Sequence, residues 1–240
     1  MRTSSFKRTV GKEKSGGLTL KPSDTSWQEY GILKYQGDKE TVDKLRQALL
    51  DAEKGIFRLS DAHPSGGKPT HNYPDDHLTG RMTYYNLVND EETWHYSGYP
   101  LIKEVVADFL SLKPDERIAI KSWGNVLRAP YKIFPHLHFG IPDNWFENKT
   151  SVCGNIFLGS EVSTATTYIL NGKQVDIPNV YGELTLFPPN VPHAVREYKG
   201  DGVRVSAAFD CFAVSRDAST EIKENPITIK GDNWIYYTHH

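Results

Sequence analysis

Residues 181–209, YGELTLFPPNVPHAVREYKGDGVRVSAAF, contain the pattern that decides the fold. A glycine turn leads into an apolar run, Glu183–Phe187, and two prolines end that run before His193. A second run follows, in which Arg204 and Ser206 alternate with apolar residues. Alternation with a period of two is typical of a strand whose two faces differ. The stretch therefore predicts two short strands, with His193 at the mouth of a β barrel and Arg204 and Ser206 on one inner face.

Short apolar runs of the same kind continue through the second half of the chain. The dipeptide Asn171-Gly172 between two of them indicates a tight hairpin. The expected strands are Arg117–Trp123, Val152–Leu158, Thr164–Leu170, Gln174–Ile177, Glu183–Phe187, Gly202–Phe212 and one more within Ile227–Tyr237. Many short strands separated by turns are typical of a sandwich or barrel, including the jelly rolls and cupins. The expected fold class is mainly β with flanking helices (α+β).

The first half of the chain has a different pattern. Apolar residues recur at helical spacing in Asp38–Ser60 and again in Pro100–Leu112. Between these two helices, Ala62–Gly98 is rich in Gly, Pro, His and Tyr, and a connection of that length is often a lid or a binding loop. We therefore expect a flexible basic tail at residues 1–20, a helical and loop region at 21–115 that packs on the core, and a catalytic core at 116–240.

Composition narrows the function classes. The 28 basic and 30 acidic residues give a formal net charge of −2, which argues against dedicated nucleic-acid binding. No apolar run approaches the roughly 18–20 residues of a membrane span, and the N-terminal residues lack the apolar region of a secretory signal. The two cysteines, Cys153 and Cys211, form no disulfide framework and fit a reducing compartment. We expect a cytoplasmic protein with no membrane partner, and a homodimer is an open option.

Histidines are the residues that carry chemistry in this chain. His136 and His138 would point to one face of a strand, where two imidazoles can converge on a metal. Each histidine, His193 included, also has a plainer interpretation, as a surface residue or as a buried imidazole bonded to backbone. Arg204 inside a barrel requires an anion, either a bound carboxylate or an internal acid such as Asp210.

Taken together, these motifs resemble the Fe(II)/2-oxoglutarate-dependent oxygenases. The similarity runs from about Lys121 to Phe209. The segments SWGNVLR (122–128) and PHLH (135–138) resemble the "W-x-N … P-H-x-H" segment of a bacterial and phage branch of that superfamily. The segment GELTLFP (182–188), with the later His193 and R-V-S (204–206), resembles its "G-D-L-x-L-F-P … H … R-x-S" segment. The resemblance implies a double-stranded β-helix core.

The resemblance also implies a site. His136 and His193 would bind Fe(II), and Arg204 with Ser206 would hold the distal carboxylate of the cosubstrate 2-oxoglutarate. Asn125 and Asn155, on neighbouring strands, are further candidates for binding the cosubstrate. Dioxygen would be the second cosubstrate, and the expected reaction is hydroxylation of an unactivated C–H bond in a small molecule or a peptide.

One departure from the superfamily motif leaves the third metal ligand open. The usual motif is His-x-Asp or His-x-Glu, and His138 occupies the carboxylate position here. His138 could be the third ligand itself. Alternatively the motif shifts to His138-Phe139-Gly140, which resembles halogenating members of the superfamily. A third option is that Asp143 supplies the carboxylate.

Three other functions stay open at this stage. A cupin-type three-histidine metalloenzyme that does not use 2-oxoglutarate shares the fold and the histidines. A halogenase-like enzyme follows from the shifted motif. A non-catalytic binding module would keep the strands without needing the histidines.

Overall fold

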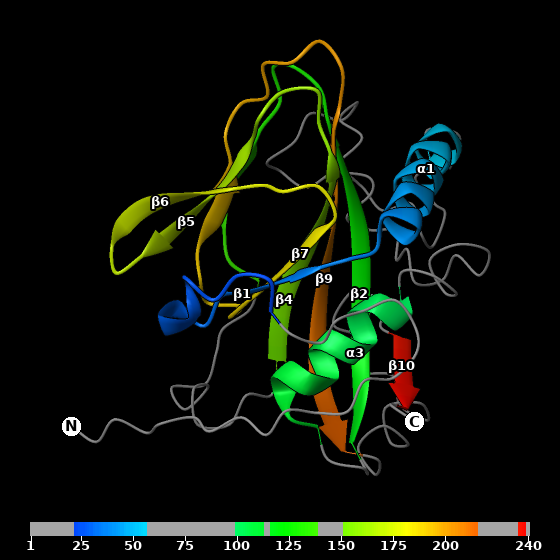
Figure 1. The fold of residues 1–240 in the computed structure, drawn as a ribbon, viewed down its shortest axis with the longest axis vertical. Coiled ribbons are helices and arrows are strands. Elements are labelled where there is room, and N and C mark those ends of the chain that lie inside the picture. The colour runs from blue at the N-terminus through cyan, green and yellow to red at the C-terminus, as the bar shows by residue number, and fades with distance from the viewer. Residues whose placement is uncertain (1–21, 57–98, 113–115, 139–150, 216–234, 239–240) are drawn as a thin grey trace.

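The computed structural model describes residues 22–56, 99–112, 116–138, 151–215 and 235–238 (Figure 1). Its first half contains a short helix and one strand, η1 (Gln28–Tyr30) and β1 (Leu33–Gln36), followed by two longer helices, α1 (Lys39–Ile56) and α3 (Tyr99–Leu110). The remaining strands are β2 (Glu116–Leu127), β3 (Ile133–His136), β4 (Ser151–Gly159), β5 (Ala165–Leu170), β6 (Lys173–Pro178), β7 (Glu183–Phe187), β8 (His193–Val195), β9 (Arg204–Ser215) and β10 (Ile235–Thr238).

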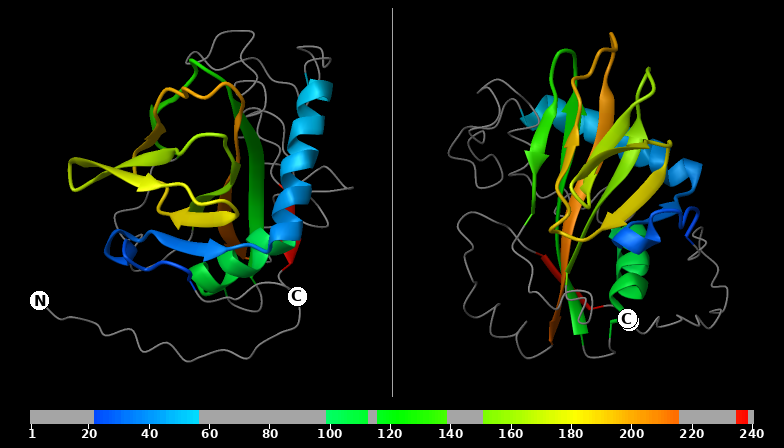
Figure 2. Two further views of the ribbon diagram at one scale, coloured as in Figure 1. Left: turned by 45° about the horizontal axis from the view of Figure 1, so that its top comes forward. Right: turned by 90° about the vertical axis from the view of Figure 1, so that its left-hand side faces the viewer.

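These strands form two antiparallel sheets. The larger sheet has the order β1-β7-β4-β9-β2-β10, and the smaller sheet has the order β3-β8-β5-β6. Figure 2 shows the smaller sheet lying against one face of the larger sheet, so that the two enclose an interior. This is the jelly-roll arrangement that the short alternating strands predict.

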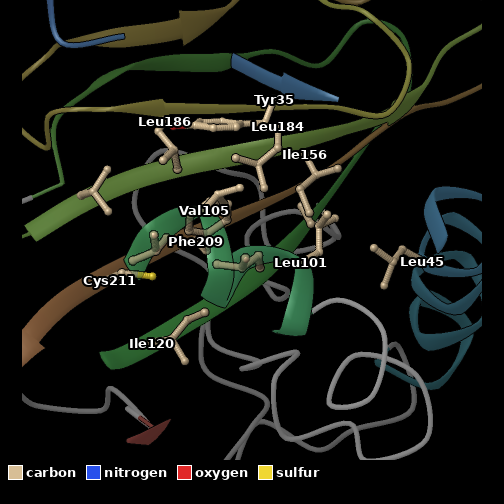
Figure 3. Packing of buried hydrophobic residues seen from close by; sticks show 14 of the residues in the cluster. Tyr35, Leu45, Leu101, Val105, Ile120, Ile156, Leu184, Leu186, Phe209 and Cys211 are labelled. Carbon is tan, nitrogen blue, oxygen red and sulfur yellow. The ribbon is translucent and has the colours of Figure 1, made fainter. Parts of the chain in front are cut away.

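The other face of the larger sheet is covered by α1 and α3. Side chains that alternate along the strands, such as Ile156, Leu184 and Phe209, point to this face and pack with Leu45 of α1 and Val105 of α3 (Figure 3). All five side chains are completely buried. This apolar layer holds the larger sheet, so the residues on its opposite face are free to be polar.

The inner face of the larger sheet is indeed polar. Residues that lie opposite each other in an antiparallel ladder share a face. Asn125 lies opposite Ser206, and Cys153 lies opposite both Asp210 and Phe187. These positions alternate with the apolar ones above, and they face the smaller sheet.

The Asn171-Gly172 hairpin is confirmed. Leu170 of β5 pairs directly with Lys173 of β6, so the turn has two residues. Both have positive φ, 50° at Asn171 and 75° at Gly172. A type I′ turn requires this conformation at both positions.

One strand, β1, was not expected from the sequence, and β3 and β8 were expected only as strands that carry or begin with the histidines, without bounds. The strand expected within Arg117–Trp123 continues to Leu127. Of Ile227–Tyr237, only the part within β10 is described. The tail at residues 1–20, the end of the first helix beyond Ile56 and the connection Ala62–Gly98 lie outside the described residues. The three-part division of the chain therefore stays a prediction. None of the described helices is long and apolar enough to cross a membrane.

Candidate metal centre

The structure brings the three predicted histidines together. His136 ends β3 and pairs with His193, the first residue of β8. His138 follows two residues after β3 ends. One ring nitrogen of each imidazole lies within 4.8 Å of the other two. All three ligand candidates therefore come from one end of the smaller sheet.

The oxygen atom beside Nδ1 of each ring determines which nitrogen is available. Nδ1 of His136 lies 2.8 Å from the carbonyl oxygen of Phe134, and Nδ1 of His193 lies 3.1 Å from that of Val191. A carbonyl only accepts, so both Nδ1 atoms carry the proton. Nδ1 of His138 lies 2.8 Å from Oδ1 of Asp210. His136 and His193 therefore keep Nε2 as a free lone pair, the arrangement usual for metal-binding histidines, and the negative charge of Asp210 favours the same tautomer in His138.

The spacing of these nitrogens fits a divalent transition metal. Nitrogens bound at about 2.1 Å to one ion lie roughly 3.0 to 3.4 Å apart, depending on the coordination geometry. Nε2 of His138 and Nε2 of His193 are 3.3 Å apart. Imidazole nitrogen is a good donor for iron, nickel and zinc alike. The residues present therefore fit a metal of this group.

Burial keeps the imidazoles ready to bind a cation. Loss of hydration lowers the pKa of His136, and it lowers the pKa of His193 well below its ordinary value. In both cases the neighbouring histidines lower the pKa further. The neutral form, which is the form that binds metal, is therefore favoured at neutral pH.

Aromatic side chains surround the cluster. The Trp123 ring lies 5.6 Å from that of His138, and the Phe187 ring lies 4.7 Å from that of His193. Tyr168 of β5 is also close, with its ring 6.0 Å from His193. These rings exclude water from the protein side of the cluster, while Phe134 and Leu137 are exposed beside it.

Arg204 and Ser206 lie on the inner face of β9 as predicted. Arg204 is 2% exposed and donates a hydrogen bond of 3.1 Å from Nη1 to Oγ of Ser206. Its Nε has no hydrogen-bond partner, and no ion pair joins it to any described residue. Burial lowers the pKa of Arg204 to about 10. An internal salt bridge from Arg204 to Asp210 is therefore wrong, because Asp210 contacts His138 instead.

The two asparagines also lie on the inner face. Asn125 is buried on β2, opposite Ser206. Asn155 on β4 forms a side-chain hydrogen bond with the hydroxyl of Tyr168. Burial raises the pKa of Tyr168, and the charge of Arg204 acts on the same hydroxyl in the opposite direction. Tyr168 is thus close to His193 of the cluster and also within reach of the charge of Arg204.

Asp143, Phe139 and Gly140 lie outside the described residues. The options that involve them stay predictions.

Sequence reasoning missed the place of Asp210. The sequence pattern indicated Asp210 only as a possible partner for Arg204. Its position six residues after Arg204 puts it on the same face of β9, as period-two alternation predicts. That signal could have directed attention to it. What the pattern could not supply is its neighbour, His138, which is 72 residues away in the chain.

Comparison with known proteins is informative at the level of fold. No protein-family model matches the chain, and no curated protein sequence matches it. Solved structures do match. EctD from S. alaskensis with bound Fe has a TM-score of 0.56 at 12% identity, over 78% of this chain and 74% of that chain. HygX from Streptomyces hygroscopicus, with nickel and 2-oxoglutarate bound, has a TM-score of 0.50 at 12% identity, over 78% and 83%. The apo form of the non-heme monooxygenase ThoJ has a TM-score of 0.51 at 11% identity, over 79% and 78%. The double-stranded β-helix fold is thereby confirmed.

Proposed function

We propose that this protein is a non-haem Fe(II)- and 2-oxoglutarate-dependent oxygenase that hydroxylates an unactivated C–H bond. The observation that carries the proposal is a buried guanidinium with no acidic partner among the described residues, in the same interior as three convergent imidazoles. An unpaired buried charge costs several kcal/mol, so a bound anion would stabilise this arginine. Solved structures of the same fold hold iron in one case, and nickel with 2-oxoglutarate in another.

Each group has a separate task in this proposal. His136, His138 and His193 would hold the metal through Nε2, since their Nδ1 atoms face oxygens. Arg204 would bind the distal carboxylate of 2-oxoglutarate, because its Nε has no protein acceptor. Ser206 orients the guanidinium by accepting from Nη1.

Bound Fe(II) with 2-oxoglutarate supplies the oxidising chemistry that activates dioxygen against a C–H bond. The protein contributes position and a dry environment. Trp123, Phe187 and Tyr168 pack around the histidines and limit the access of water. Asn155 orients the Tyr168 hydroxyl through a side-chain hydrogen bond.

Rival functions differ in what they require of Arg204. A cupin-type three-histidine enzyme would need the histidines but not a buried arginine that lacks an acid. A binding module would need neither. The arginine therefore favours a dicarboxylate cosubstrate over both.

The first test measures cosubstrate binding rather than turnover, because the substrate is unidentified. Fe(II)-loaded protein is titrated anaerobically with 2-oxoglutarate, and the visible charge-transfer band is followed. We expect Arg204→Ala to weaken 2-oxoglutarate binding by about 100-fold or more, as loss of a charge-assisted bidentate contact predicts. Metal affinity should stay unchanged, because Arg204 contacts none of the histidines.

The matched control is Arg196→Ala. Arg196 forms an exposed ion pair with Asp176, which contributes little to stability. This variant should bind 2-oxoglutarate as the wild type does. Equal affinity in the wild type and Arg204→Ala would exclude the cosubstrate role and favour the cupin-type alternative.

A further inference from the structure

Asp210 is a buried carboxylate that none of the tasks above uses. It is 7% exposed and lies on the inner face of β9, opposite Cys153 of β4 and Lys121 of β2. Its Oδ1 lies 2.8 Å from Nδ1 of His138. The oxygen is not aligned for a straight hydrogen bond from that ring, so the contact is one of position and charge.

The other neighbours of Asp210 do not neutralise it. The Cys153 thiol hydrogen-bonds to the carboxylate, and burial, with the charge of Asp210 second, raises the pKa of that thiol well above its ordinary value. The thiol is therefore a neutral donor. The ammonium of Lys121 lies over the Trp123 ring, 5.9 Å from its centroid, and no ion pair joins it to Asp210 among the described residues. Among the described residues, His138 is thus the one basic side chain within ion-pair distance of the Asp210 carboxylate.

Charge makes this contact significant. Replacing a carboxylate ligand by a neutral imidazole makes a metal site one unit more positive. A carboxylate in contact with the far nitrogen of that imidazole restores the missing negative charge one ring away. Its charge also favours the tautomer that carries the proton on the near nitrogen, and increases the basicity of the nitrogen that binds metal.

We propose that Asp210 is the positioning residue of the third metal ligand, acting on the metal only through His138. The proposal rests on the metal centre proposed above. In the usual ligand set a carboxylate binds the metal directly. Here the carboxylate, Asp210, would lie behind His138, the histidine that occupies the carboxylate position. His136 and His193 have neutral backbone carbonyls in the equivalent place, so among the described residues His138 alone of the three has a charged partner at Nδ1.

The test is a double-mutant cycle on metal affinity, with Co(II) as the probe in a competition titration. Asp210→Asn keeps the shape and removes the charge. We expect it to weaken Co(II) binding by about 10- to 100-fold and to shift the visible bands of the Co(II) form. His138→Gln should weaken binding as well. In the double variant, Asp210→Asn should cause no further loss, because its route to the metal is gone.

Each other outcome has a distinct meaning. Additive losses would overturn the proposal, since Asp210 would then act on the metal directly. Unchanged affinity in Asp210→Asn would assign the carboxylate a structural role only, and would also overturn it. The matched control is Glu53→Gln, which alters another buried acid, paired with Arg128 away from the histidines. If the wild type does not bind Co(II) at all, the proposed metal centre itself is wrong.

A second measurement needs no variant at position 210. Zinc-loaded wild-type protein is labelled with ¹⁵N-histidine, and the three Nδ1 protons are observed by NMR. We expect the His138 proton to lie furthest downfield, because the oxygen nearest to Nδ1 belongs to a carboxylate, with His136 and His193 as internal controls. Three similar shifts, or an unprotonated Nδ1 in His138, would overturn the proposal.

Discussion

Two imidazoles of the cluster, those of His136 and His193, are held in one protonation state by burial and by the carbonyl oxygens beside them. Phe134 and Val191 offer carbonyl oxygens to Nδ1 of His136 and His193, and these contacts hold the neutral tautomer with Nε2 unprotonated. Burial opposes addition of a second proton to either ring, and the pKa of each is lowered for this reason first. Metal binding and acid stability are therefore linked through the same two side chains.

This linkage predicts how the stability of the metal-free protein depends on pH. Because the folded-state pKa of His193 lies below the unfolded value of about 6.5, the unfolded chain binds more protons in mild acid. The stability that the neutral His193 contributes is fully present above about pH 6.5. As pH falls from there towards the folded pKa, the free energy of unfolding decreases by at most about 1.4 kcal/mol per pH unit.

The measurement is urea unfolding of chelator-treated protein at about pH 7 and about pH 5.5, on the two sides of the unfolded pKa. We expect His193→Gln to lose less stability between these pH values than the wild type, since it lacks the titrating ring. Carboxylates titrate in both proteins and cancel in the comparison. Equal losses would show that His193 is not held neutral by the fold.

At the scale of single elements, β4 has to approach its neighbours very closely. Gly154 lies opposite Phe209 of β9 and Leu186 of β7. A Cβ at this position would lie 2.4 Å from Cζ of Phe209 and 2.6 Å from the carbonyl oxygen of Thr185. Both distances are far below van der Waals contact, and the backbone oxygen cannot move without breaking the ladder. The absence of a side chain at Gly154 leaves the space that the Phe209 ring occupies.

We therefore expect Gly154→Ala to destabilise the protein by about 1–3 kcal/mol or more, as overpacking of a core does. The control is Gly172→Asn in the type I′ hairpin turn. Nothing lies within 4 Å of a Cβ there, and Asn tolerates the positive φ of 75°. Chemical denaturation of both variants and of the wild type measures the free energy of unfolding of each. A Gly154→Ala protein as stable as Gly172→Asn would contradict the packing argument.

Elements with strong local patterns were predictable from the sequence, and the others were not, for identifiable reasons. The alternation around Arg204 and the Asn171-Gly172 turn are local signals, and both predictions were confirmed. β3 contains Pro135, and β8 has only three residues, so neither shows a strand pattern. In β1, Lys34 looks like a surface residue, but it is buried because it pairs with Glu183, 149 positions away.

The candidate site shows the same limit. The motifs indicated which histidines converge, and the structure brings those three together. The contact of Asp210 with His138 depends on how β9 faces the segment after β3, which belong to different sheets. No local pattern reports such a distance. Contacts between residues that are distant in the sequence could therefore be identified only from the three-dimensional structure.

At the scale of the whole molecule, the candidate ligands divide between the two sheets. The histidines belong to the end of the smaller sheet or follow it directly, whereas Arg204, Ser206 and Asp210 belong to the larger one. A metal bound by the histidines and chelated by a dicarboxylate that reaches Arg204 would join the two sheets through the interior. Binding of the two ligands should therefore be coupled, and the coupling should appear as stability of the entire fold.

Thermal unfolding tests this coupling without a substrate. With Ni(II) bound, 2-oxoglutarate at about 100 times its Kd should add about 2.7 kcal/mol, which is roughly 5–10 °C in Tm for a domain of this size. In the presence of a chelator, the same 2-oxoglutarate should add much less, because the dicarboxylate then contacts only the larger sheet. Arg204→Ala should keep the shift caused by Ni(II) and lose the shift caused by 2-oxoglutarate, whereas His193→Ala should lose both. If 2-oxoglutarate raises Tm equally with and without metal, the two ligands bind independently and the interior does not join the sheets in this way.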